Sequence, residues 1–159
     1  MTAAFIGLGA NLGEPQRQVQ EAFRELDAIP HTRVVRTSSL YRSAPLGYAE
    51  QPSFVNAVAQ VETGLPAERL LAELHAIETR HGRSRSFANA PRTLDLDLLL
   101  FGNAILDVPG LKVPHPRMHE RAFVLLPLVE IAENVAIPGR GTAKAFLDRC
   151  GNQGVEKLD

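Results

Sequence analysis

Two segments with helical periodicity, each enclosed between strand-like runs, constrain the fold of this chain more than any other feature. Pro15 suits the first turn of a helix, apolar residues follow at helical spacing as far as Ile29, and Pro30 ends the segment. The second helix is predicted between Pro66 and Gly82. Its buried stripe would consist of Leu70, Leu71, Leu74 and Ile77.

Runs of apolar or β-branched residues predict strands over residues 3–8, 32–42 and 54–61, and a fourth from Leu94 onward. The order is therefore β-α-β-β-α-β, which is typical of an α+β, ferredoxin-like sheet with antiparallel strands and two helices on one face. A C-terminal extension follows, with a proline-rich loop, a short apolar helix and a possible last helix over residues 108–118, 122–132 and 142–149.

Composition narrows the class of protein. The chain has 159 residues, a net charge of −1 and a pI of about 6.5, so a single domain over residues 1–159 is expected, and a nucleic-acid binder is disfavoured. The single cysteine, Cys150, excludes an intramolecular disulfide and a multi-cysteine metal site. Neither a signal peptide nor a membrane span is recognisable, which predicts a cytoplasmic protein without membrane contact.

Asp95 and Asp97 lie two residues apart in the fourth predicted strand, so both carboxylates should point to the same face, with Cα atoms ~6.5–7 Å apart. Aspartate is a poor strand former, and like charges on one strand face repel. A solvated face without a function is one interpretation of this pair. The other is a site for divalent cations, because Mg²⁺ prefers carboxylate oxygens completed by substrate phosphates.

Several cationic side chains surround this pair in the predicted fold, where a loop, the strand and a later loop reach the same end of the sheet. Arginine binds phosphate oxygens in a bidentate manner, so carboxylates beside arginines suit a nucleoside triphosphate. A P-loop motif is absent, and the glycines from Gly7 to Gly13 only approximate a dinucleotide fingerprint, so we expect them to form a tight turn. The cations are Arg83, Arg85, Arg92, His115 and Arg121.

A second group of residues could hold a flat polar molecule. Phe54 and Asn56 share a strand face, which places a ring for stacking beside an amide that donates and accepts hydrogen bonds. The loop at Ala44–Gly47 precedes them, and Phe123 could supply another ring. Core packing of the rings, and a capping role for the asparagine, are the structural alternatives.

These residues together resemble the 6-hydroxymethyl-7,8-dihydropterin pyrophosphokinase family over nearly the whole chain. The run Pro91-Arg-Thr-Leu-Asp-Leu-Asp97 is very specific to that family. Moderately specific matches are Ile6–Gly13, Ser39–Gly47, Gln51–Asn56, Ile77-Glu78, Gly82–Arg85 and Val113-Pro-His115.

The resemblance implies transfer of a pyrophosphoryl group from ATP to a pterin alcohol by a monomer in folate biosynthesis. It implies that Asp95 and Asp97 ligate two Mg²⁺ ions and that Arg83 and Arg92 join them in catalysis. The ATP site would comprise Glu78, Arg83, Arg85, Arg92, Leu98, His115 and Arg121. The pterin site would comprise Ala44, Pro45, Leu46, Phe54, Asn56 and Phe123.

The chain departs from the family pattern at a few positions. Phe54 stands where tyrosine is common, and no tryptophan precedes Pro91. Pro116 follows the histidine where tyrosine is frequent, and Gly110 and Lys112 stand where arginine and threonine can contact ATP. The metal carboxylates are intact.

Direct attack of the pterin hydroxymethyl oxygen on the β-phosphorus of ATP is the predicted mechanism, with the loop over residues 83–91 closing over ATP. Two alternatives belong to other classes. An RNA-binding module has the same element order but needs aromatic strands and a basic face. A ligand-sensing or metal-sensing regulator would keep the carboxylates without the arginines.

Overall fold

The computed structural model describes residues 1–44, 53–82 and 94–158, and every statement below concerns this part of the chain. Its helices are α1 (Pro15–Asp27), α2 (Ala67–Arg80), a 3₁₀ turn η1 (Met118–Glu120), α3 (Ala122–Ile131) and α4 (Ala143–Cys150). Its main strands are β1 (Thr2–Ala10), β2 (Thr32–Thr37), β3 (Tyr41–Ser43), β4 (Phe54–Thr63) and β5 (Asp95–Phe101). The short strands are β6 (Leu106–Val108), β7 (Leu111–Val113), β8 (Ala136–Ile137), β9 (Gly141–Thr142) and β10 (Glu156–Lys157).

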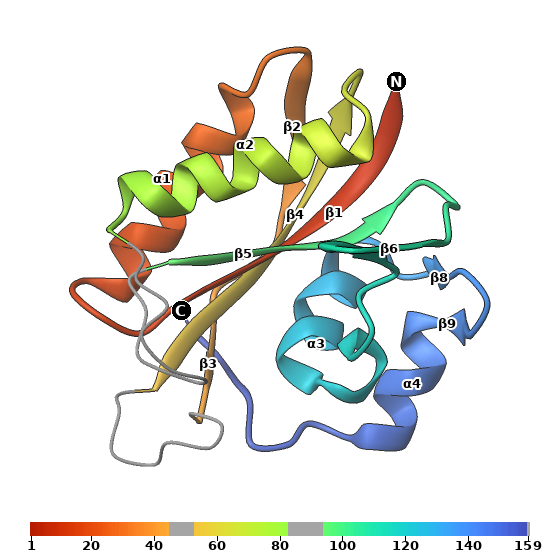
Figure 1. Ribbon diagram of the computed structural model, residues 1–159. Helices are drawn as coiled ribbons and strands as arrows, with labels where there is room; N and C mark the ends of the chain where they lie inside the picture. Colours follow the sequence, from red (N-terminus) through yellow and green to blue (C-terminus); the bar gives the residue numbers. More distant parts are fainter. Residues whose placement is uncertain (45–52, 83–93, 159) are drawn as a thin grey trace.

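The main sheet has the order β10-β3-β4-β1-β5, with β2 also paired to β4, and each of these pairings is antiparallel (Figure 1). The predicted strand over residues 32–42 is in fact two strands. At the break, the Ser38 N–H donates to the Val58 carbonyl, and the Val58 N–H donates to Ser38 Oγ, both at 2.9 Å. A serine side chain thus takes the place of a backbone acceptor and interrupts the ladder.

The predicted turn is confirmed at Gly13 and was wrong for Gly7 and Gly9. Gly7 and Gly9 lie inside β1, which continues to Ala10, and only Gly13 adopts the left-handed conformation of a turn, with φ +66°. Gly7 pairs with Val58 and Asp97, and Gly9 pairs with Asn56 and Asp95. Gly9 therefore lies between two predicted site residues, Asn56 on β4 and Asp95 on β5, and Gly7 lies beside Asp97.

Helices α1 and α2 cover one face of the sheet, and α3 covers the other, with α4 packed beside α3 (Figure 1). The predicted pair, α1 and α2, packs on one face through a core that includes Ile6, Leu26 and Leu74. The C-terminal extension supplies α3, which packs on the other face, and α4, which packs against α3, in a core that includes Leu99, Leu125 and Ile137. No described helix is long and apolar enough to cross a membrane.

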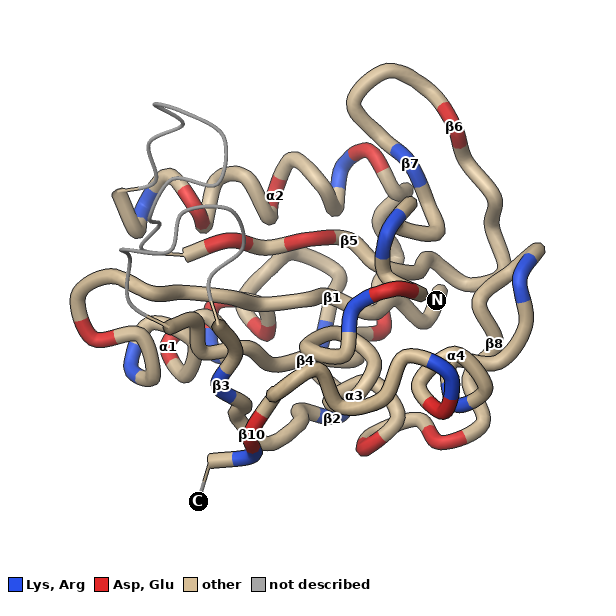
Figure 2. The backbone as a smooth tube through the Cα atoms, turned by 90° about the horizontal axis from the view of Figure 1, so that it is seen from below, with Lys and Arg blue, Asp and Glu red and all other residues tan. Residues whose placement is uncertain are grey.

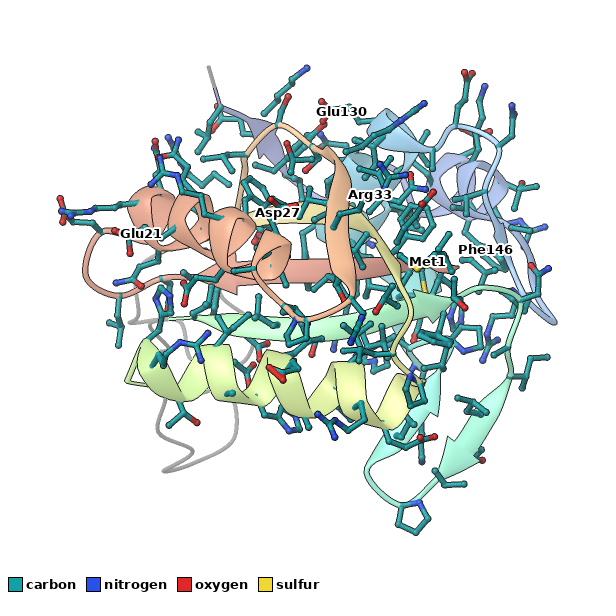
Figure 3. All side chains as sticks on the ribbon, turned by 90° about the horizontal axis from the view of Figure 1, so that it is seen from above. Met1, Glu21, Asp27, Arg33, Glu130 and Phe146 are labelled. Carbon is teal, nitrogen blue, oxygen red and sulfur yellow. The ribbon has the colours of Figure 1, made fainter. Side chains whose placement is uncertain are left out.

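Side-chain hydrogen bonds join the helices to the edge of the sheet (Figure 3). Asp27, at the end of α1, accepts from the Val34 N–H on β2 at 2.8 Å. Glu130 of α3 accepts from the Tyr41 hydroxyl at 2.6 Å and from the Ser39 N–H and hydroxyl. These bonds hold the segment between β2 and β3 where the ladder is interrupted.

Replacing Glu130 with glutamine should make the stability of the protein less dependent on pH in acid. Desolvation opposes ionisation, but the hydrogen bonds from Tyr41 and Ser39 outweigh it and lower the pKa of Glu130 from 4.5. The carboxylate therefore stabilises the fold above about pH 4.5, and this contribution is lost as the pH falls through the lowered pKa. Urea unfolding between pH 3 and 7 would measure the effect, expected at about 1 kcal/mol.

Glu133→Gln, at an exposed position just after the same helix, is the matched control. If Glu130→Gln and Glu133→Gln show the same acid dependence as the unchanged protein, the hydrogen bonds of Glu130 contribute nothing to stability.

Candidate active site

Successive side chains of β5 point to opposite faces of the sheet, which separates its leucines from its carboxylates. Leu94, Leu96 and Leu98 are buried in the core beneath α1 and α2. Asp95 and Asp97 are partly exposed and alternate with these leucines, so they point to the opposite face, as the sequence predicts. Figure 2 shows the two acidic positions on β5, beside β1, which carries no charged residue.

Gly9 of β1 leaves space on the sheet between Asp95 and Asn56. Asp95 is paired with Gly9, and Gly9 is paired with Asn56 on its other side. Adjacent strands are ~4.8 Å apart, so about 10 Å of sheet separates the Asp95 and Asn56 backbones. A Cβ atom added at Gly9 would lie 3.1 Å from Asn56 Nδ2 and 4.0 Å from the Phe54 ring. The missing side chain therefore leaves room for the Asn56 amide.

Asn56 is buried, and its amide is oriented by a neighbouring hydroxyl. Ser43 Oγ donates to Asn56 Oδ1 at 2.5 Å, so Nδ2 is the group on the side of Gly9. Phe54 is partly exposed and pairs with Ser43, which brings the predicted ring and amide together on this face. Ala44 is exposed directly after β3, whereas Pro45 and Leu46 lie outside the described residues.

His115 lies beside β5 because its N–H donates to the Leu99 carbonyl at 3.0 Å. Burial lowers the pKa of His115, Arg121 and Arg117 lower it further, and Asp95 opposes them. The Arg117 N–H donates to His115 Nδ1 at 3.1 Å. The imidazole is therefore neutral at pH 7 with its proton on Nε2, which makes Nε2 a hydrogen-bond donor.

Arg121 lies at the start of α3, in the electrostatic field of both carboxylates. Burial and Arg117 lower its pKa, while Asp97, Glu120 and Asp95 raise it. Its guanidinium lies 5.6 Å from the centre of the Phe123 ring, and its buried Nε has no hydrogen-bond partner among the described residues. Phe123 is itself partly buried against α4 and the C-terminal tail, residues 151–158. Arg121 can donate to an anionic ligand, but the two carboxylates would repel such a ligand unless bound cations neutralised them.

Glu78, a predicted residue of the ATP site, is held between α2 and β5. Its side chain is 3% exposed on α2, and Oε2 accepts from the Leu96 N–H at 2.7 Å. Leu96 lies between Asp95 and Asp97, so Glu78 holds the outer edge of β5 at the point where the carboxylates project. This supporting hydrogen bond was not predicted from the sequence, and the ATP contact of Glu78 stays a prediction.

A pocket of about 290 Å³ lies between α2, β5 and β7. It includes the predicted residues Asp97, Leu98 and His115. Leu71, expected in the buried stripe, is partly exposed and lines it as well, and His75 one turn later was not predicted. Their i, i+4 spacing on α2 was the available signal. The remaining lining residues are Leu96, Gly110, Leu111, Lys112 and Pro116.

The predicted arginines Arg83, Arg85 and Arg92 and the predicted closing loop lie outside the described residues. Among the residues that the structure describes, no group of three or more His, Cys, Asp or Glu side chains could enclose a metal ion. Two carboxylates on one face fit Mg²⁺ nonetheless, because this ion commonly takes one or two carboxylates and completes its shell with water and phosphate.

Known proteins resemble this chain in sequence and in fold. A chain from Pseudomonas aeruginosa named 2-amino-4-hydroxy-6-hydroxymethyldihydropteridine pyrophosphokinase is 47% identical over 97% of this chain and 95% of its own. The protein of that name from Haemophilus influenzae is 46% identical over 87% and 86%. A crystal structure of an HPPK-DHPS in complex with substrates superposes with a TM-score of 0.70 at 14% identity, over 93% of this chain and 43% of that one.

The model of the family described as 7,8-dihydro-6-hydroxymethylpterin-pyrophosphokinase matches residues 5–133. That match includes β1 from Phe5 onward and all of β4 and β5, and therefore the carboxylates, glycines and amide described above. The curated relatives agree with it over most of their own lengths. The chain belongs to the 7,8-dihydro-6-hydroxymethylpterin-pyrophosphokinase family.

Proposed function

We propose that this protein transfers the pyrophosphoryl group of ATP to 6-hydroxymethyl-7,8-dihydropterin, in folate biosynthesis, and releases AMP. The observation that carries the proposal is the row across the sheet, in which Asp95 and Asp97 stand between a pocket on one side and Asn56 on the other. Two substrates bound at these two places would meet beside the carboxylates. The names of the relatives agree with this reaction.

Two Mg²⁺ ions would be held by Asp95 and Asp97 together with the ATP phosphates. When bound, they neutralise the triphosphate and polarise the β-phosphoryl group. The two carboxylates would hold the ions in fixed positions, because β5 is anchored on both edges, by β1 on one side and by Glu78 on the other. Rigid placement of such groups is required for catalysis by positioning.

The nucleoside of ATP would occupy the pocket between α2 and β7, against Leu98. His115 would donate a hydrogen bond from Nε2 to a phosphate oxygen, since Nδ1 already accepts from the Arg117 N–H. Arg121 would contact the transferred phosphates, because it shares the electrostatic field of both carboxylates. Arg83, Arg85 and Arg92 complete this proposed set through the resemblance.

The pterin would lie against Asn56, with its ring stacked between Phe54 and Phe123. The amide of Asn56 offers Nδ2 to the heterocycle because Ser43 occupies Oδ1. The backbone at Ala44, Pro45 and Leu46 would supply the remaining hydrogen bonds, as the resemblance implies.

In the reaction, the hydroxymethyl oxygen of the pterin forms a bond to the β-phosphorus of ATP. The bond from that phosphorus to the bridging oxygen of the α-phosphate breaks, and its electron pair leaves with AMP. The hydroxyl proton passes to solvent or to the Asp97 carboxylate. The arginines and His115 stabilise charge that develops on the phosphoryl oxygens, which is the main requirement in phosphoryl transfer.

We further propose that the enzyme is a ferredoxin-like, single-domain monomer of the cytoplasm. Its four main strands in chain order, with β2 and β3 counted as one interrupted strand, support the ferredoxin-like assignment. A single cysteine is compatible with a reducing compartment.

A coupled assay of AMP formation from ATP and 6-hydroxymethyl-7,8-dihydropterin tests the function. AMP should appear only when both substrates and Mg²⁺ are present, and chelation with EDTA should abolish it. ATP binding without AMP release on addition of the pterin would favour a ligand-sensing regulator. Binding of RNA oligomers in place of ATP would favour an RNA-binding module.

A further inference from the structure

Gln153, in the C-terminal tail, holds the backbone on both sides of Arg121. Its Nε2 donates to the Glu120 carbonyl at 2.9 Å, and its Oε1 accepts from the Ala122 N–H at 2.9 Å. The carbonyl belongs to the peptide group before the Arg121 Cα, and the N–H belongs to the peptide group after it. A single side-chain amide therefore holds both peptide planes that set φ and ψ of Arg121.

The tail presents this amide through a defined turn. Gln153 adopts φ +53°, the Gly154 N–H donates to Asn152 Oδ1 at 2.8 Å, and Asn152 Nδ2 donates to the Val155 carbonyl at 2.7 Å. Val155 is buried against Ala122 and Tyr41. In Figure 1 the tail runs from α4 past the start of α3 to β3, where β10 pairs with it.

The start of α3 needs such a partner. Arg121 is the N-cap of the helix, with φ −117° and ψ 110°, and its side chain makes no capping hydrogen bond. An arginine has only donors, so it cannot accept from the first N–H groups of the helix. Gln153 supplies the missing acceptor to Ala122 and leaves the Arg121 side chain available for a different partner.

We propose that Gln153 is a positioning residue for Arg121 in pyrophosphoryl transfer, an inference that rests on the proposed function. The Arg121 guanidinium lies over Phe123, and its Nε has no hydrogen-bond partner among the described residues. No hydrogen bond from Nε to a described residue fixes its direction, which therefore depends on the contact with Phe123 and on the backbone from which the side chain projects. Small displacements of a phosphate-binding group are costly in rate. The tail thus acts on the reaction without touching a substrate.

A double-mutant cycle between Gln153→Ala and Arg121→Ala tests the proposal. Gln153→Ala alone should lower kcat roughly tenfold. This is less than the roughly 100-fold loss of rate that a displacement of about 1 Å can cause. The KM for the pterin should stay within twofold. In the Arg121→Ala background, Gln153→Ala should cause no further loss, because the group that it positions is absent. Gln153→Glu, which keeps the acceptor for Ala122, should recover part of the activity.

Thr142→Ala is the matched control, because it removes the N-cap of α4, where Thr142 Oγ1 accepts from the Ala145 N–H, without touching residues 120–122. The ¹H–¹⁵N signal of Arg121 Nε should shift in Gln153→Ala and stay unchanged in Thr142→Ala. An unmoved signal, or equal losses in the wild-type and Arg121→Ala backgrounds, would overturn the proposal. Failure of the proposed function would appear separately, as no AMP from the unchanged protein.

Discussion

Replacing Asp97 with asparagine should reduce AMP formation by a factor of about 10³ while the protein remains folded. The change keeps the shape of the side chain and removes the negative charge that we assign to Mg²⁺ binding. Loss of a metal ligand removes stabilisation from charge that develops in the transition state, which is worth several kcal/mol. Asp97 is partly exposed on the face opposite the leucine core, so the free energy of unfolding should change by less than about 1 kcal/mol.

Steady-state kinetics over a Mg²⁺ titration would measure this effect, with thermal unfolding as the test of the fold. Asp148→Asn, on the exposed surface of α4, removes the same charge far from β5 and should retain full activity. Near-normal turnover of Asp97→Asn would show that the metal is held elsewhere. A large loss of stability would instead assign Asp97 a structural role.

Replacing Gly9 with valine should raise the KM for the pterin by about 10- to 100-fold, the equivalent of one lost hydrogen bond to a buried group. Asn56 Nδ2 lies 3.1 Å from the position of the new Cβ, so the amide must move from the place in which Ser43 holds it. Gly9 lies in a regular strand outside the left-handed region, and the effect therefore comes from lost space and not from backbone strain.

Separate measurement of KM for the two substrates distinguishes displacement of Asn56 from general damage. Gly9→Ala should give a smaller change in the same direction, and the KM for ATP should change less than twofold in both variants. Gly64→Ala is the control, since its Cβ would make only ordinary contacts of 3.5 Å with His31 and Met1. Equal increases in both KM values would mean that the substitution distorts the sheet as a whole.

Periodicity predicted the parts of the fold that depend on neighbours along the chain. The apolar faces of α1 and α2 follow from the 3.6-residue period of a helix. The alternation of buried leucines and aspartates on β5 follows from the two-residue period of a strand. For the same reason, the sequence placed Asp95 and Asp97 on one face and Phe54 beside Asn56. The break between β2 and β3 was not predictable in this way, because Ser38 competes for a backbone partner on β4, 20 residues away.

The amino-acid sequence by itself determined which residues carry charge and on which face of its own element each one lies. Only the tertiary structure decided what stands beside them. Gly7 and Gly9 are strand residues, and Gly9 leaves room for the Asn56 amide. Glu78 supports β5, and Gln153 holds the backbone around Arg121. The physical reason is that register and hydrogen bonds between distant segments depend on how whole elements pack, a choice that no local pattern encodes.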